Sequence, residues 1–249
     1  MHYFTINIFV FNTAYKIMRF SLTAAFVGAA ALISTVSADL YNRLNVDDAV
    51  FLFVDHQTGL LNLVQDYNPD TYLNNVMGLA ESAKYFNVPT ILTTSREDGP
   101  NGIMLPELKN LFPNSTYIAR PGQINAWDDE RFVKAIKKTG RKQLIISGIV
   151  TDVCVTFVSL SAKKAGYEVF VVTDASGTFS EAVRDASWLR MQQSGIQLMN
   201  WFGVACELGR DWRKDINGMA ALFAKRLPSY AHIMDSFAGA QAAVKASSS

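Results

Sequence analysis

Short apolar runs alternate along the chain with segments of helical periodicity. The runs are apolar at nearly every position, which is typical of strands buried on both faces. In the segment 71–86, by contrast, Tyr72, Val76 and Leu79 recur at the spacing of one helix face. We predict strands at 49–55, 89–95, 117–120, 143–148, 168–174 and 196–201, helices at 71–86, 129–140, 152–164 and 179–194, and a last helical region at 205–227.

This alternation predicts a single α/β domain. Parallel strands need helical crossovers, and the helices then cover both faces of the sheet. The chain shows no internal repeat and no long linker. We therefore expect a three-layer sandwich with a central, mostly parallel sheet of about six strands over residues 40–240, followed by a disordered tail at 241–249.

Residues 1–38 follow a different pattern. Arg19 precedes the apolar run 20–33, and small residues follow up to Ala38. This is the layout of a secretory signal peptide cleaved after Ala38, and Met18 is an alternative start of translation. An uncleaved membrane anchor is the other interpretation, but the apolar run is short for a span. We expect a secreted or secretory-pathway protein without stable membrane association after cleavage.

The composition excludes several classes of function. The chain has 23 basic and 22 acidic residues, so its charge gives no reason to expect a nucleic-acid partner. Two cysteines cannot form a disulfide-rich framework. The three histidines, His2, His56 and His232, lie far apart in sequence, and no metal-ligand spacing is present. We expect neither a metal nor another cofactor.

Three chemically reactive residues stand at or just after the ends of predicted strands. Asp55 ends the first strand, Arg120 ends a short one, and Cys154 follows the strand at 143–148. Ligands of open parallel sheets bind at the carboxyl ends of the strands. The irregular segment 96–128, rich in Gly, Pro and Asn, also begins at this edge and is either functional or a tolerated surface insertion.

Each of these residues has a purely structural alternative. Asp55 could cap a turn, Arg120 could be a solvated charge, and Cys154 could be an apolar filler or a disulfide partner of Cys206. A nucleophilic Cys154 is the functional interpretation. A helix N-terminus, capped by Thr151 and Asp152, would lower the thiol pKa. A carboxylate could accept the thiol proton, and freed backbone N–H groups could bind an oxyanion.

Longer stretches carry a resemblance to a known family. They include "FLFVDHQTGL" (51–60), "RKQLIISGIVTDVCV" (141–155) and "NWFGVACELGRDWR" (200–213). The chain resembles the isochorismatase-like cysteine hydrolases, in particular their YcaC-like branch. The resemblance implies that Asp55 is the general base, Cys154 the nucleophile and Arg120 the basic member of a triad. It also implies a cis peptide at Ile149–Val150.

The same resemblance implies an oxyanion hole formed by the backbone N–H groups of Val150 and Cys154. We expect Gln57, Trp127 and Ile149 in the substrate pocket. Metal-binding members of the superfamily use histidines that have no match here, which agrees with the expected absence of a metal.

The resemblance favours a hydrolase that cleaves the C–N bond of a small amide or related carbonyl compound. Two alternatives stay open: an isochorismatase acting on an enol ether, and a non-catalytic secreted interaction protein with the same fold. We also expect a homo-oligomer. Aromatic and Met side chains could form its interface or simply the core: Phe179, Trp188, Met191, Trp201 and Trp212.

Overall fold

The computed structural model describes residues 41–248. The signal peptide predicted at 1–38 lies outside these residues and stays a prediction. Leu44 to the C-terminus forms one compact unit. Within the described residues, no helix is both long enough and apolar enough to span a bilayer.

A six-stranded sheet forms the centre of the molecule, and all its neighbouring strands are parallel. The predicted fold class is therefore confirmed. The strand order is β3-β2-β1-β4-β5-β6, so the chain winds outward in one direction from β1 and in the other from β4. The strands are β1 (Ala49–Val54), β2 (Thr90–Ser95), β3 (Thr116–Arg120), β4 (Gln143–Gly148), β5 (Glu168–Val172) and β6 (Gln197–Met199).

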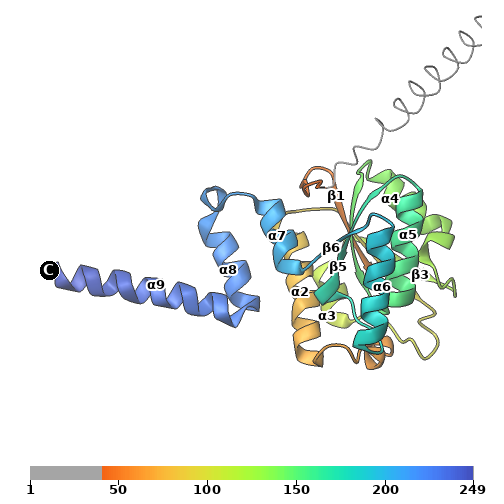
Figure 1. Cartoon of the computed structure of the whole chain (residues 1–249), viewed down its shortest axis with the longest axis horizontal. Coiled ribbons are helices and arrows are strands. Elements are labelled where there is room, and N and C mark those ends of the chain that lie inside the picture. The colour runs from red at the N-terminus through yellow and green to blue at the C-terminus, as the bar shows by residue number, and fades with distance from the viewer. Residues whose placement is uncertain (1–40, 249) are drawn as a thin grey trace, which may run out of the picture. The chain divides into compact units, whose positions relative to one another are not determined.

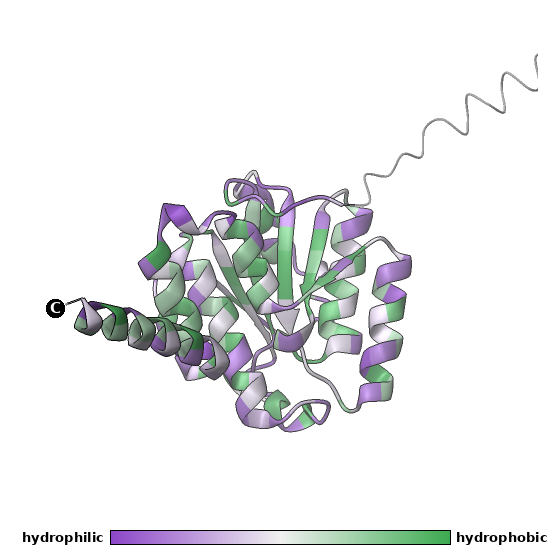
Figure 2. Cartoon of the chain, turned by 60° about the vertical axis from the view of Figure 1, so that its left-hand side comes forward, coloured by the Kyte–Doolittle hydropathy of each residue, from purple (hydrophilic) through white to green (hydrophobic). Residues whose placement is uncertain are grey.

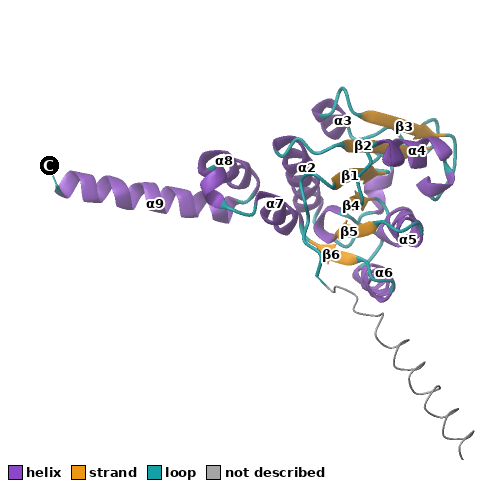
Figure 3. Cartoon of the chain, turned by 90° about the horizontal axis from the view of Figure 1, so that it is seen from above, coloured by secondary structure: helices purple, strands orange, loops and turns teal. Residues whose placement is uncertain are grey.

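Helices cover both faces of the sheet, as Figure 3 shows from above. Helices α2, α3 and α7 lie on one face, and α4, α5 and α6 lie on the other (Figure 3). Helices α8 and α9 follow α7. The bounds are α2 (Pro69–Tyr85), α3 (Pro106–Leu111), α4 (Glu130–Lys138), α5 (Thr156–Lys164), α6 (Glu181–Gln193), α7 (Trp201–Gly209), α8 (Ile216–Arg226) and α9 (Pro228–Ser247).

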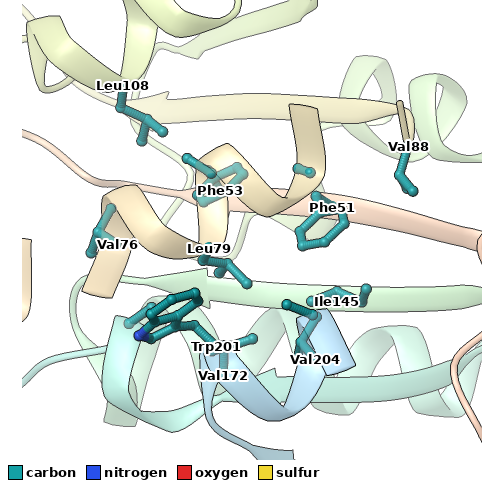
Figure 4. Close-up of a cluster of buried hydrophobic side chains, with 14 of the residues drawn as sticks. Phe51, Phe53, Val76, Leu79, Val88, Leu108, Ile145, Val172, Trp201 and Val204 are labelled. Carbon is teal, nitrogen blue, oxygen red and sulfur yellow. The ribbon is translucent and has the colours of Figure 1, made fainter. Parts of the chain in front are cut away.

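Alternating side chains of the central strands build two hydrophobic layers. In β1, Phe51 and Phe53 face α2 and α7, whereas Leu52 faces the layer of α4 and α5. Trp201, the first residue of α7, is buried beside Leu79 of α2 in the first layer (Figure 4). Every residue of β1 and β4 is buried, which explains why these strands read as unbroken apolar runs.

The aromatic and Met residues predicted for an interface or a core fall into two groups. Met191 and Trp201 are core residues, with exposures of 0% and 1%. Phe179 and Trp212 are exposed, at 45% and 42%. Trp188 packs against the second hydrophobic layer. Core packing therefore explains only part of the set.

The C-terminal helices differ from the sequence prediction. The disordered tail predicted at 241–249 is instead largely helical, because α9 continues to Ser247. The segment after Phe237 is rich in alanine, which has the highest intrinsic helix propensity. Helix α3 was also missed: it is only six residues long and begins at Pro106 within the segment expected to be irregular.

Candidate active site

The winding direction of the chain reverses between β1 and β4. In open parallel sheets such a switch point is the usual ligand site. Asp55 directly follows β1, and Cys154 lies six residues after the end of β4. Arg120 ends β3, two strands away, and its long side chain extends back across β2 to Asp55. The predicted convergence of the three side chains is thus observed.

Asp55 and Arg120 form a fully buried ion pair. The guanidinium Nη2 of Arg120 donates to both carboxylate oxygens of Asp55, at 3.0 and 2.9 Å, and both side chains are 0% exposed. Asp55 has a φ of 56°, which is uncommon for a non-glycine residue. Its backbone N–H donates to the carbonyl of Thr93 on β2, which fixes the start of the turn.

Arg120 is held from three sides. Besides Asp55, its Nη1 donates to the hydroxyl of Thr93 at 2.8 Å, and its Nε donates to the carbonyl of Gln123 at 3.2 Å. The Arg120 side chain is enclosed by protein, with 0% of it exposed, so it does not reach solvent. Its observed contacts fix the Asp55 carboxylate instead, and its positive charge favours a thiolate at Cys154.

Cys154 lies in a π-helical turn, Thr151–Val155, that precedes α5. The N–H of Val155 donates to the carbonyl of Val150, which gives the turn its wider hydrogen-bond pattern. The peptide between Ile149 and Val150 is cis, as the resemblance implied. The Asp55 carboxylate and the Val150 N–H lie beside the Cys154 sulfur and act on its pKa.

The pKa of the Cys154 thiol is raised well above its ordinary value, chiefly by burial and further by the neighbouring Asp55 carboxylate. The Val150 N–H and the Arg120 charge act in the opposite direction. Burial also raises the pKa of Asp55, against the influence of Arg120. The lowered thiol pKa expected from the sequence is therefore wrong. The thiol keeps its proton, and the Asp55 carboxylate lies beside it.

Thr151 and Asp152, expected to cap the helix at the cysteine turn, form no capping hydrogen bond with it. The hydroxyl of Thr151 is buried and has no hydrogen-bond partner among the described residues, so it caps nothing. The carboxylate of Asp152 accepts a 2.6 Å bond from the Thr178 hydroxyl. Thr178 in turn donates its backbone N–H to Asp66 at 2.8 Å. Neither Thr178 nor Asp66 was predicted, because no sequence pattern places the loop before α6 or the segment before α2 beside the cysteine turn.

The three predicted pocket residues have different surroundings. Ile149 is fully buried and pairs with Gly177 in an extension of the sheet beside the cysteine turn. Gln57 is fully buried, and its amide bonds to Ser95 at both N–H and carbonyl, which ties the chain after β1 to the end of β2. Trp127 packs edge-on against Tyr167.

Trp127 therefore lies apart from the other predicted site residues. Tyr167 directly precedes β5, so the Trp127 ring packs near the amino end of a strand, whereas Asp55 and Cys154 follow carboxyl ends. The second aromatic neighbour of Trp127 is Phe132 of α4. Trp127 belongs to the hydrophobic layer beneath the helices, and the prediction that it lines the pocket is not supported by its contacts.

His56 follows Asp55 in sequence but has a structural role. Its ring bonds to the hydroxyls of Ser147 and Tyr72, at 3.0 and 3.3 Å, and it is fully buried. Burial lowers its pKa to about 3, so the imidazole is neutral at physiological pH. His56 therefore contributes hydrogen bonds to the core of the site, and Asp55 is the titratable group that lies beside Cys154.

Two further expectations from the sequence concern a disulfide between the two cysteines and a metal site. Cys154 and Cys206 are both free thiols, so the alternative of a disulfide between them does not hold in this structure. Among residues 41–248, no three His, Cys, Asp or Glu side chains gather in a way that could hold a metal ion.

The switch point of the doubly wound sheet thus holds a cysteine beside a buried carboxylate. Comparison with known proteins gives the family. The isochorismatase domain model matches residues 49–201, and the chain belongs to the isochorismatase family. It falls within the YcaC-like part of that family.

The similarity to YcaC proteins covers most of the chain. It is 62% identical over 197 residues to an Escherichia coli (strain K12) protein described as probable hydrolase YcaC, spanning 79% of this chain and 95% of the relative. The structure of E. coli YcaC, described as an octameric hydrolase of unknown specificity, matches with a TM-score of 0.79 over 80% of this chain and 98% of that one.

Two further relatives bear on function. YcaC from Pseudomonas aeruginosa, solved with hexane-2,5-diol and covalent acrylamide, is 63% identical, with a TM-score of 0.79 over 80% of this chain and 98% of that chain. A secreted isochorismatase effector, Isc1, of Phytophthora sojae (strain P6497) is 24% identical over 150 residues, 57% of this chain and 68% of the relative. The chain is thus a hydrolase of the isochorismatase family.

Proposed function

We propose that this protein is a cysteine hydrolase that cleaves the C–N bond of a small amide or related carbonyl compound. The observation that carries the proposal is that the Cys154 thiol lies beside Asp55, whose carboxylate is fixed by Arg120. A thiol beside an oriented base is the arrangement needed for nucleophilic catalysis. The identity to YcaC hydrolases supports it.

In the first half-reaction, the Cys154 sulfur attacks the carbonyl carbon of the substrate, and its proton passes to Asp55. A C–S bond forms, and the carbonyl oxygen becomes an oxyanion. The N–H groups of Val150 and Cys154 are the donors that we assign to this oxyanion. Asp55 then gives its proton to the leaving nitrogen as the C–N bond breaks, which leaves a thioester on Cys154.

In the second half-reaction, water attacks the thioester carbonyl and gives a proton to Asp55. The C–S bond breaks, the acid product leaves, and the proton returns from Asp55 to the departing sulfur. Because the resting thiol has a raised pKa, proton transfer to Asp55 must accompany the attack on the substrate. Arg120 acts through Asp55 as a positioning residue.

The covalent acrylamide of the P. aeruginosa relative supports a reactive thiol, because acrylamide is an electrophile that adds to thiolates. The 24% identity to the P. sojae effector, against 62% to YcaC, gives the enol-ether activity less support. A panel of small amides, with isochorismate included, tests the proposal. We expect amide turnover and a thioester adduct mapped to Cys154 by mass spectrometry.

Two results would contradict this function. Turnover of isochorismate without turnover of any amide would assign the enol-ether activity instead. Absence of any turnover, together with acrylamide labelling no faster at Cys154 than at Cys206, would favour a non-catalytic interaction protein. Cys206 provides the internal reference because it is a half-buried free thiol outside the site.

A further inference from the structure

The loop between α3 and β3 carries the tripeptide Asn114-Ser115-Thr116, the one position in this sequence that fits the acceptor motif for N-linked glycosylation. The motif consists of an asparagine, any residue except proline, and a hydroxyl-bearing residue two positions after the asparagine. The proposed hydrolase chemistry does not use these residues. Because an attached oligosaccharide is bulky and hydrated, the asparagine that carries it must lie at the surface of the folded protein.

Asn114 meets this requirement. It is exposed, and so are the neighbouring Pro113 and Thr116. Within the described residues, the Asn114 side-chain amide makes no hydrogen bond, whereas the amides of Asn74 and Asn125 donate to other segments of the chain. The Asn114 nitrogen can therefore carry a substituent without breaking a contact of the fold.

A tight turn presents the asparagine. The Ser115 N–H donates to the carbonyl of Phe112 at 3.2 Å, which closes a four-residue turn with Pro113 and Asn114 at its two central positions. Proline is favoured at the first central position because its ring fixes φ near the value that the turn needs. Asn114 thus stands at the tip of the loop.

Phe112 provides an aromatic surface two residues before the asparagine. Its ring packs on Phe53 of the core with centroids 5.9 Å apart, but the residue is only partly buried. Phe112 and Asn114 border the same surface hollow of about 440 Å³, together with Val88 and Pro89. The face of an aromatic ring is electron-rich and attracts the polarised C–H groups of a pyranose ring. A sugar on Asn114 can therefore cover apolar surface that the polypeptide leaves open.

The loop lies away from the cysteine site. It precedes β3, and Arg120 at the other end of that strand is about 13 Å further along, as four residues at 3.3 Å each give. Strand β3 is the outermost strand of the sheet (Figures 1 and 3). Helix α9, whose apolar residues Figure 2 shows, extends from the opposite side of the body (Figures 1 and 3). A glycan on the loop therefore leaves the site open and shields one end of a sheet edge.

We propose that Asn114 is a site of N-linked glycosylation and that the first sugar packs on Phe112. The donor is an oligosaccharide joined through a diphosphate to a membrane lipid. The Asn114 Nδ2 attacks the anomeric carbon of this donor: a C–N bond forms, the C–O bond to the diphosphate breaks, and the nitrogen loses one proton to the transferring enzyme. The lipid diphosphate is the leaving group. The signal peptide predicted at 1–38 is the sequence feature that brings the chain to the donor.

Expression of the full chain in a eukaryotic host tests the site. We expect one glycan, and peptide-N-glycosidase in heavy-oxygen water should convert Asn114 to labelled aspartate, detected by peptide mass spectrometry. Asn114→Gln and Thr116→Val should each abolish the glycan, whereas Thr116→Ser should keep it because the hydroxyl is retained. The matched control Asn110→Gln changes an exposed asparagine that lacks the motif and should leave the glycan in place.

An unmodified Asn114, whether in the exported protein or because the chain does not enter the secretory pathway, would overturn the proposal. Loss of the glycan in Asn110→Gln would place it at the wrong asparagine and would also overturn it. The outcome is independent of the amide panel, because the loop takes no part in the proposed hydrolysis.

Thermal unfolding tests whether the sugar packs on Phe112. The unchanged chain, Phe112→Leu, Asn114→Gln and the double variant form a double-mutant cycle, all prepared in the same host. We expect the glycan to raise the melting temperature by about 2–4 °C when Phe112 is present and by clearly less in the Phe112→Leu background. Leucine keeps an apolar contact with the core but has no aromatic face. Equal increases in both backgrounds, in variants that circular dichroism shows to be folded, would overturn the packing on Phe112.

Discussion

Two regions of the molecule each contain an aspartate and one of the two cysteines. In one, Asp55 follows β1 and Cys154 follows β4; in the other, Asp174 follows β5 and Cys206 lies within helix α7. Asp55 is bound by Arg120 and contacts the thiol. Asp174 instead accepts a 2.9 Å bond from the Trp201 N–H at the start of α7.

The two regions contain the same residue types but differ in the groups that surround the aspartate and the cysteine. Burial raises the pKa of Asp174 to about 6, and no cation is among the causes of this shift. Burial alone raises the pKa of Cys206. At Cys154 the same burial is combined with a proton acceptor and a backbone N–H donor. In the proposed mechanism the chemistry depends on Arg120 and the cysteine turn, because these hold Asp55 and Cys154 together.

Removing the thiols gives the largest expected difference between the regions. We expect Cys154→Ala to reduce turnover of the substrate found in the amide panel by at least about 10⁴-fold, because no other group can form the thioester. Cys206→Ala should leave kcat/KM within about twofold. Steady-state kinetics measures both, and the proposed mechanism fails if the two variants lose the same activity.

Replacing Asp55 should affect turnover and thiol reactivity in opposite directions. Asp55→Asn removes the group that takes and returns the proton, so we expect turnover to fall by about 10²–10⁴-fold. The lost negative charge had raised the thiol pKa, and Arg120 then acts unopposed. The thiol pKa should therefore fall, and the pH profile of iodoacetamide alkylation at Cys154 should shift to lower pH.

Asp174→Asn is the matched control for this experiment and should change neither the turnover nor the alkylation profile of Cys154. Because Asp55→Asn leaves the buried Arg120 unpaired, a stability loss of about 3–5 kcal/mol is expected, and circular dichroism must verify folding. If alkylation and turnover fall together in the folded variant, Asp55 serves the structure of the site and not proton transfer.

The Asp174 region should show its own pH dependence, in stability. The folded pKa of Asp174, about 6, exceeds the ordinary value of 3.8. For a raised pKa, the favourable contribution is complete below pH 3.8 and is lost as the pH rises through about 6. Asp174→Asn keeps an acceptor for the Trp201 N–H without this loss. We expect it to stabilise the protein above pH 7 by up to about 3 kcal/mol.

Thermal unfolding measured at pH 4 and at pH 7.5 examines this expectation. The difference in melting temperature between Asp174→Asn and the unchanged chain should be near zero at pH 4 and largest at pH 7.5. A difference that is the same at both pH values would show that the carboxylate does not titrate on folding. Lys245→Gln, which changes an exposed charge, controls for general effects of pH.

Much of the fold follows from local patterns in the sequence. The central strands β1 and β4 are buried on both faces, so each appears as an apolar run, and the parallel sheet follows from the alternation of strands with helices. The convergence of Asp55 and Cys154 follows from the same strand ends. The partners of Arg120 could not be predicted, because its path across Thr93 depends on the strand order.

Other features of the site depend on contacts between distant segments. The π-helical turn arises because the Val155 N–H bonds to the carbonyl of Val150, one residue further back than in an α-helix. No side-chain periodicity reveals this hydrogen bond. The direction of the Cys154 pKa shift was mistaken because the helix terminus was visible in the sequence, whereas the burial and the proximity of Asp55 were not. Trp127 was misplaced because proximity in sequence to Arg120 does not imply proximity in space.

The smallest expected effect distinguishes two threonines, one in each region. The Thr178 hydroxyl donates to Asp152, which lies two residues before Cys154, at 2.6 Å. The Thr173 hydroxyl donates to the carbonyl of Met199 at the end of β6, at 3.0 Å. Each can be replaced by valine of nearly the same shape, so the two substitutions remove one hydrogen bond each and differ mainly in location.

Thr178→Val should loosen the cysteine turn, and we expect alkylation of Cys154 and kcat to change by about 3–10-fold, in line with about 1–1.5 kcal/mol for such a bond. Thr173→Val should cost similar stability but leave both rates within about twofold. Measuring melting temperature and the alkylation rate in parallel separates the two effects. Equal changes in rate for both variants would mean that the Thr178–Asp152 bond contributes to stability only. If this bond positions the cysteine turn, the rate must respond to its loss and not to the loss of a distant hydrogen bond.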